Sequence, residues 1–382
     1  MFPLIWMGGL VTSHGVGMSV PDWPNTFGYN MWAVPWGHWV GGDAGGVFYE
    51  HFHRLLGTVA GFAAVGCVLA ACGASHRPFA RRCWGVAAIV GLALVVVGFA
   101  IVGGRSGGHV GSLGGALALT ATVAWLTRNP PESRPWALLL SFALLAAIIG
   151  QGVLGGLRVV FDSVDLAMVH GITGQLTLCV GGLTALAASP WWHNVERQHR
   201  PAVAWPAIIL LGLCVIQLVV AVAMRHNGAG LAVPDWPLHY GQVVPPVNDA
   251  ALAVTNAERR FELHLPAVSL AQVWLHVGHR LGAYLILGVT VWVVWRLWHV
   301  ARKHAAFVGG LVLVQATLGV LTVLLGKPAD LATLHVATGA LLLLTVALLA
   351  ARLGRQYGVR PALAPATSTP TPAASPSPYA LT

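Results

Sequence analysis

The sequence predicts an all-α integral membrane protein built from two tandem-repeat four-helix bundles. Hydrophobic residues make up 56% of the 382 residues and charged residues only 9%. The mean hydropathy is +0.72. These values exclude an ordinary soluble domain. Long apolar segments recur along the chain, and the same short motifs occur once in each half, which indicates an internal repeat.

The apolar segments set the expected helices. They lie at residues 2–13, 52–73, 84–103, 110–127, 136–157, 166–188, 204–224, 274–298, 305–326 and 332–351. A transmembrane helix needs about 20 apolar residues. The first segment is too short to cross alone, which predicts a clipped N-terminus or a start further upstream. Eight segments form the repeated core, and residues 83–127 form an extra hairpin with its turn at 103–111.

The distribution of Lys and Arg predicts the orientation. With the loop at 14–50 outside, the inner loops and tail carry 13 of these residues and the outer loops carry 6. Cytoplasmic loops are usually the richer in Lys and Arg. The net charge of +9 is therefore a topology signal. No clustered basic patch appears, which excludes nucleic acid as a partner.

Two copies of one motif mark the repeat. VPDWP occurs at residues 20–24 and again at 233–237. Parallel repeats of this kind place two halves around a pseudo-two-fold axis along the membrane normal. We expect an N-terminal bundle over 1–190 and a C-terminal bundle over 200–355. The Pro-, Ala-, Ser- and Thr-rich tail at 361–382 has little to bury and is expected to be disordered.

Four histidines occupy equivalent places in the two halves. His53 and His279 each begin a His-Arg-Leu sequence, and His170 and His335 each lie near the start of a later segment. An ionisable side chain in hydrocarbon is costly and is usually functional. Facing helices of a bundle can hold a haem iron between paired imidazoles. The pattern predicts two haem-iron sites, whereas the alternative is a polar cap residue at each interface.

Glu50 is the candidate catalytic residue. It precedes His53 by three residues and so shares its helix face. A carboxylate beside a haem can act as a general base or stabilise positive charge on a substituent being oxidised. The second half has His276 at this position, which predicts one reactive site and one accessory site. Alternatively, Glu50 only stabilises a helix N-terminus.

Two arginines are candidates for cofactor binding. Arg54 and Arg280 each follow a candidate iron ligand. Either could pair with a haem propionate or extend to a lipid phosphate. His276 shares a face with His279 and competes with it as a ligand, but the repeat aligns His279 with His53.

These motifs together resemble the haem A synthase family. The matching pieces are EHFHRLLG, the VPDWP loops, QGVLGGLRV followed by LAMVHG, and the second-half HVGHRLG and LHVATG. They cover most of the chain, from about residue 5 to 352. The resemblance implies eight helices in two bundles. This chain departs from the family in its extra hairpin and in lacking the outer-loop cysteine pair of many bacterial relatives.

The resemblance also implies roles for the predicted residues. Glu50 would be the essential acid. His53 and His170 would serve the substrate haem, and His279 and His335 would ligate a haem b cofactor in the C-terminal bundle. The implied reaction converts haem O to haem A by oxidising a ring methyl to a formyl group, for use by terminal oxidases.

The resemblance further implies a setting for this reaction. The protein would lie in the cell (inner or cytoplasmic) membrane, with its haem sites near the outer face. Its partners would be haem O synthase and cytochrome oxidase assembly factors, and it could form a homo-oligomer. The electron donor is left open.

Two other functions explain part of the pattern. A di-haem electron-transfer cytochrome linked to quinol would need the four histidines but not an acid in only one half. A transporter would need polar residues near the middle of the membrane, whereas the candidates here gather at one face.

Overall fold

The structure, a computed structural model, confirms an all-α membrane protein. It describes residues 1–41, 45–73, 78–102, 104–126 and 135–358. In this part of the chain the regular elements are helices, and two isolated β-bridges lie in loops. Nine of the described helices are long and apolar enough to cross a membrane. The expected disordered tail at 361–382 lies outside the described residues.

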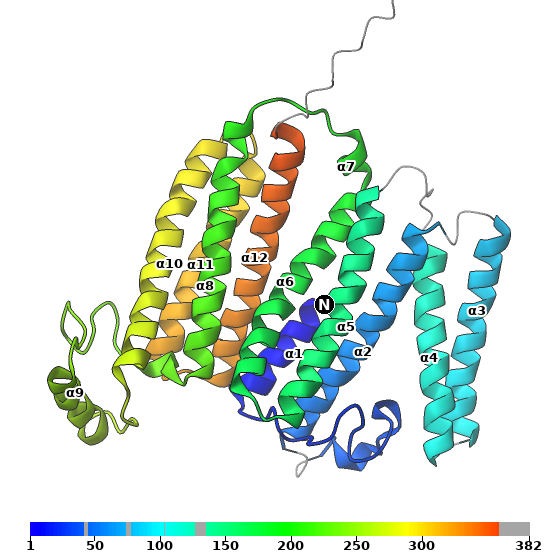
Figure 1. The fold of residues 1–382 in the computed structure, drawn as a ribbon, viewed down its shortest axis with the longest axis horizontal. Coiled ribbons are helices and arrows are strands. Elements are labelled where there is room, and N and C mark those ends of the chain that lie inside the picture. Colours follow the sequence, from blue (N-terminus) through cyan, green and yellow to red (C-terminus); the bar gives the residue numbers. More distant parts are fainter. Residues whose placement is uncertain (42–44, 74–77, 103, 127–134, 359–382) are drawn as a thin grey trace, which may run out of the picture.

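The first group of helices contains α1 (Phe2–Ser13), α2 (Val47–Ala71), α5 (Pro135–Val160) and α6 (Val164–Ala188). α5 packs against both α2 and α6, and α1 packs against α2. α1 has only 12 residues. Figure 1 shows that the N-terminus lies partway along the neighbouring helices.

The second group contains α8 (Trp205–His226), α10 (Leu270–Leu297), α11 (Arg302–Leu324) and α12 (Ala329–Tyr357). α8 and α11 each pack against both α10 and α12. α12 also contacts α1 and α6, so it joins the two groups. It is the most buried of the nine spans described. The short α7 (Pro190–Asn194) lies in the connection between the groups.

The extra hairpin consists of α3 (Pro78–Val96), a π-helical turn (Val97–Val102) and α4 (Gly104–Leu126). α4 packs against α2, and α3 lies on its far side (Figure 1). The prediction of a turn over 103–111 was wrong, because α4 already begins at Gly104. These glycines serve close helix packing: a Cβ at Gly107 would lie 2.2 Å from the carbonyl oxygen of Gly98.

Two further boundaries differ from expectation. α2 begins at Val47 rather than at 52, so the predicted acid and the first histidine both lie inside the helix. The long second loop contains an unpredicted helix, α9 (Asp249–Phe261). Its N-cap, Asn248, accepts a hydrogen bond from the backbone N–H of Ala251 at 2.9 Å. Its buried face includes Arg259, which periodicity based on apolar residues misses.

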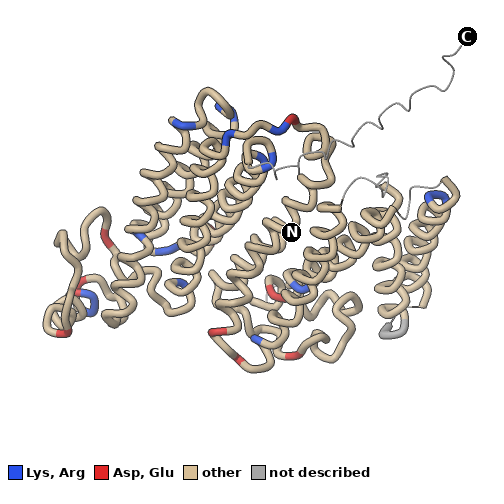
Figure 2. Tube along the Cα trace, turned by 45° about the horizontal axis from the view of Figure 1, so that its top comes forward, with Lys and Arg blue, Asp and Glu red and all other residues tan. Residues whose placement is uncertain are grey.

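The charges are distributed unequally between the two ends of the bundles. Figure 2 shows that most acidic residues lie at the end that carries the VPDWP loops and α9. Among the described acids, Glu196 lies at the opposite end, in the connection between α7 and α8. Basic residues at that opposite end include Arg302, Arg352 and Arg355. This is the pattern expected when the loop-bearing end faces outward.

The packing of α3 on α4 can be tested with a matched pair of substitutions. A Cβ at Gly91 would lie 2.5 Å from the backbone nitrogen of Ala118, whereas a Cβ at Gly85 would meet Trp125 at an ordinary 3.4 Å. We expect Gly91→Ala to lower the free energy of unfolding by about 1–3 kcal/mol, because backbone must move. Gly85→Ala is expected to be neutral. Thermal unfolding in detergent, followed by circular dichroism, measures both, and equal stability of the two variants would contradict the packing.

Candidate functional site

The structure brings the four predicted histidines together as two pairs. In the first histidine pair, the ring centres of His53 on α2 and His170 on α6 lie 6.4 Å apart, with the rings at 82°. In the second histidine pair, His279 on α10 and His335 on α12 have the same 6.4 Å separation, with the rings at 74°. The two halves therefore build the same arrangement.

This spacing fits one metal ion between each pair of rings. An imidazole nitrogen lies about 1.2 Å from its ring centre and binds a metal at about 2 Å, so two rings on opposite sides of one ion have centres roughly 6.3 Å apart. Within the described residues, no cluster of three or more side chains could hold a metal by itself. A metal held by a pair must therefore bring further ligands, as the iron of a macrocycle does.

Small residues keep the space beside the rings open. Glycine faces three of the four histidines: a Cβ would lie 3.0 Å from the ring of His53 at Gly8, 3.1 Å from that of His170 at Gly155, and 3.0 Å from that of His335 at Gly319. The Nδ1 atoms of His53 and His335 are buried and lack a hydrogen-bond partner. Buried polar atoms are normally satisfied, so these rings fit a ligand.

Glutamines orient the second histidine pair. The amide nitrogen of Gln217 on α8 lies 2.9 Å from Nδ1 of His279 and donates to the carbonyl oxygen of the same residue at 2.8 Å. The amide nitrogen of Gln315 on α11 lies 3.3 Å from Nε2 of His335. Partners of this kind fix the orientation of a ligating imidazole.

The first histidine pair is held less completely. With its amide oriented to satisfy its neighbours, Gln151 on α5 lies 3.0 Å from Nδ1 of His170. His53 has no such partner. Counting back from the two VPDWP motifs, the position of Gln217 is occupied in the first half by Leu4. The two pairs are therefore alike in spacing but different in support.

Glu50 lies in the first turn of α2 and is only 2% exposed. Its carboxylate accepts hydrogen bonds from the backbone N–H of Val20 at 2.9 Å and from the guanidinium of Arg54 at 3.0 Å. These contacts go to the loop and to Arg54 instead of capping its own helix. At the equivalent place in the second half, Nδ1 of His276 lies 2.9 Å from the carbonyl oxygen of Ala229. The contact with the loop is kept there, but the negative charge is not.

Arg54 and Arg280 each bind a VPDWP loop in the same manner. Arg54 donates to the carbonyl oxygens of Val20, Asp22 and Asn25, at 2.7, 2.6 and 3.1 Å. Arg280 donates to those of Val233, Asp235 and Leu238, at 2.8, 2.6 and 3.1 Å. These contacts give both arginines a loop-holding role that the sequence did not indicate. Their binding of a cofactor stays a prediction.

The aspartate of each motif closes the loop beyond it. The two carboxylate oxygens of Asp22 accept the N–H groups of Phe27 and Gly28, both at 2.8 Å. Phe27 and Gly28 have φ values of 52° and 74°, in the left-handed region. Partial burial raises the pKa of Asp22. These hydrogen bonds and the nearby Arg54 outweigh that effect and hold the pKa of Asp22 below its usual range. Asp235 makes the same contacts in the second half.

Sequence reasoning missed two arginines because it counted them only as outer-loop charges. Arg158, in the last turn of α5, donates to the carbonyl oxygen of Gly17 at 3.0 Å. Arg225, in the last turn of α8, donates to the carbonyl oxygen of Gly9 at 3.0 Å and to the hydroxyl of Ser13 at 2.8 Å. A signal was present, since Arg158 follows Gln151 by seven residues, or two helical turns.

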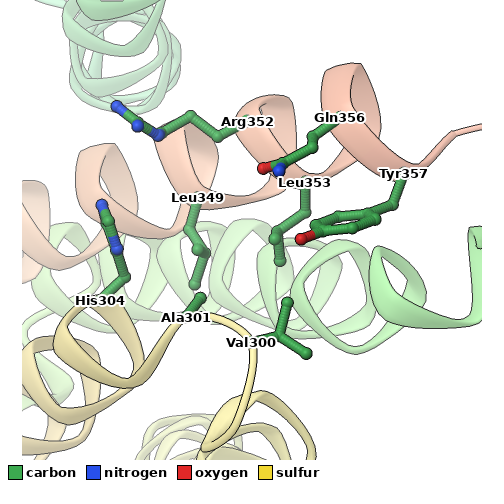
Figure 3. A pocket seen from close by; sticks show the side chains of 8 residues that line it. All are labelled: Val300, Ala301, His304, Leu349, Arg352, Leu353, Gln356 and Tyr357. Carbon is green, nitrogen blue, oxygen red and sulfur yellow. The ribbon is translucent and has the colours of Figure 1, made fainter. Parts of the chain in front are cut away.

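A pocket between α12 and the turn from α10 to α11 lies away from the two histidine pairs. His304, Arg352, Gln356 and Tyr357 are among the side chains that line it (Figure 3). Arg352 follows His335 by 17 residues on α12, or roughly 25 Å. The pocket therefore lies at the opposite end of the bundle.

Comparison with known proteins finds one family model and several relatives that share one name. A family model described as "Cytochrome oxidase assembly protein" matches residues 108–348. A Beijerinckia indica protein named "Heme A synthase" is 32% identical over 243 residues, which cover 60% of this chain and 65% of that protein. A Methylobacterium radiotolerans protein of the same name is 33% identical over 246 residues, with the same coverage. The matched region thus spans slightly less than two thirds of these relatives.

The family match includes His170 and the second histidine pair, but it begins after Glu50 and His53. It extends over more than half of the chain and over helices of both groups. The chain therefore belongs to the cytochrome oxidase assembly protein family.

Proposed function

We propose that this protein is a haem A synthase, which oxidises a ring methyl of haem O to a formyl group and so supplies haem A to terminal oxidases. One observation carries the proposal: two histidine pairs of equal spacing are present, but among the described residues a buried carboxylate, Glu50, accompanies only the first of them. Relatives named "Heme A synthase" support it.

We assign the substrate haem to the first histidine pair and a resident haem b to the second. A substrate must enter and leave, so its ligands should be held less firmly. Gln217 contacts Nδ1 of His279, whereas Nδ1 of His53 has no hydrogen-bond partner among the described residues. A resident cofactor gains from the fixed orientation that such a partner gives. Haem b, when bound, supplies electron transfer.

Glu50 would act on the substituent being oxidised. Arg54 and the N–H of Val20 each bind one oxygen of its carboxylate. A carboxylate oxygen can accept more than one hydrogen bond, so Glu50 can still take a proton from water or from the substrate. Its buried negative charge would also stabilise positive charge that develops during oxidation. Arg54 positions the carboxylate for both roles.

The setting follows from the same proposal. We place the protein in the cell membrane with both histidine pairs near the outer face, under the VPDWP loops. The excess of Lys and Arg in the loops and tail of the opposite end supports this orientation. Haem O synthase would supply the substrate, and cytochrome oxidase assembly would consume the product.

The role of Glu50 can be tested with Glu50→Gln. This change keeps the size of the side chain and removes the charge and the basic oxygen. We expect formation of haem A to fall by about a hundredfold or more, with the protein still folded. The measurement is chromatography of haems from cells that lack haem A and co-express this chain with a haem O synthase.

The matched control is Asp165→Asn, which changes an exposed acid to its amide in the first turn of α6. It should form haem A normally. Suppose that cells with the unchanged chain yield only haems B and O, although the protein in their membranes is folded and haem-loaded. This result would favour the di-haem electron-transfer cytochrome instead.

The division of labour between the pairs predicts different losses. His279→Ala should remove the tightly bound haem b from the purified protein, because the ring held by Gln217 is lost. His53→Ala should keep that haem but stop conversion of haem O. Haem content per protein and the low-spin absorption spectrum measure the first effect, and haem chromatography measures the second.

His299→Ala is the control, since His299 is exposed near the opposite end of α10. It should change neither quantity. Equal loss of resident haem in the His53 and His279 variants would overturn the assignment of the two pairs.

A further inference from the structure

We propose that Arg158 and Arg225 hold the carboxylates of the haem-type ligands at the first and second histidine pairs, respectively. The inference rests on the proposed function, since it takes both ligands to be porphyrins that carry propionates. It departs from the sequence-based prediction, which gave this role to Arg54 and Arg280.

Each arginine lies near one histidine pair. Gly155, which faces the ring of His170, precedes Arg158 by three residues on α5. Ser13, which accepts a hydrogen bond from Arg225, also contacts the hydroxyl of Thr333 at 2.9 Å, two residues before His335. The Arg158 guanidinium interacts electrostatically with both His53 and His170. The Arg225 guanidinium interacts electrostatically with His335. Each lies in the last turn of its helix, at the end that carries the VPDWP loops. Each histidine pair therefore has a cation next to it.

Neither arginine forms an ion pair with a described residue. In the part of the chain that the structure covers, the salt bridge joins Arg54 to Glu50. Glu50 is the acid that interacts electrostatically with Arg158, and its carboxylate is already bonded to Arg54 and to Val20. Partly buried cations normally have a partner. A site that provides two cations without described ion-pair partners fits a ligand that brings the negative charge.

Most of each guanidinium is still available. A guanidinium has five N–H donors. The hydrogen bonds of Arg158 and Arg225 to described residues all start from Nη2. Their Nε and Nη1 atoms are not among the described buried atoms that lack a partner, so these nitrogens remain accessible. By contrast, Arg54 and Arg280 use both terminal nitrogens on loop carbonyls.

The repeat strengthens the inference because the two arginines are not equivalent in it. Aligning Gln151 with Gln315 places Thr322 opposite Arg158, and aligning the VPDWP motifs places Thr12 opposite Arg225. The two halves therefore supply their cations from helices that are not equivalent in the repeat. Each half folds with a threonine at the position where the other half has its arginine. A shared ligand chemistry explains why both pairs have one. Arginine suits this task because its fork matches a carboxylate.

The test compares haem b with its dimethyl ester, which has the same iron and ring but no carboxylates. The full chain in detergent is titrated with each, and binding is followed by the Soret band. Arg158→Gln is measured in a His279→Ala background, which leaves the first pair, and Arg225→Gln in a His53→Ala background. We expect each change to weaken haem b binding on the order of tenfold or more, with little effect on the ester.

Arg260→Gln is the matched control, since this exposed arginine lies on α9 at the same end of the protein. It should keep the preference for haem b. The inference would be overturned if the Arg158→Gln or Arg225→Gln variant kept the same ratio of affinities for haem b and its ester as its parent. If Arg158→Gln does not fold, Arg158→Lys replaces it and should show a reduced preference for haem b over the ester. An unchanged preference in Arg158→Lys would also overturn the inference. If the chain with both arginines unchanged binds haem b at neither histidine pair, the proposed function would be overturned instead.

Discussion

The arrangement at the helix ends that carry the VPDWP loops depends on two arginines that hold these loops, one partly buried and the other buried. Arg54 and Arg280 each donate to three carbonyl oxygens of a VPDWP loop. Backbone carbonyls near hydrocarbon must be satisfied within the protein, and the planar fork of arginine can satisfy several at once. In the first half the same arginine also fixes the proposed catalytic group, since Arg54 and the N–H of Val20 together hold the carboxylate of Glu50. The loop and the acid are therefore positioned by one interaction.

On this common frame, a few substitutions make the halves different. Glu50 has the counterpart His276, and Leu4 has the counterpart Gln217. The first exchange adds a negative charge beside one histidine pair, and the second removes the partner of one imidazole. Both changes act in the same half. These exchanges leave the fold unchanged, because Arg54 and Arg280 hold the two loops through equivalent carbonyl contacts.

The extra hairpin has a structural connection to the first half. Asn30, in the loop above the first histidine pair, contacts His109 at 3.3 Å and accepts from Ser112 at 3.1 Å, both on α4. A Cβ at Gly108 would collide with the side chain of Ala33. Gly107 thus brings α4 against α3, and the neighbouring Gly108 brings α4 against the loop. The first half is supported on a side where the second half has no such hairpin.

The sequence by itself determined the helices, the repeat, the histidine pairs and the position of Glu50, because membrane spans and duplicated motifs are written in local composition and order. It also predicted a hairpin, although it took glycines that pack helices for a turn. Only the tertiary structure decided what the arginines do. Arg54 and Arg280 donate from both terminal nitrogens to loop carbonyls, whereas Arg158 and Arg225 donate to described residues from Nη2 alone. A basic residue at a helix end has the same local signature in each case, and its partners come from segments far away in the chain.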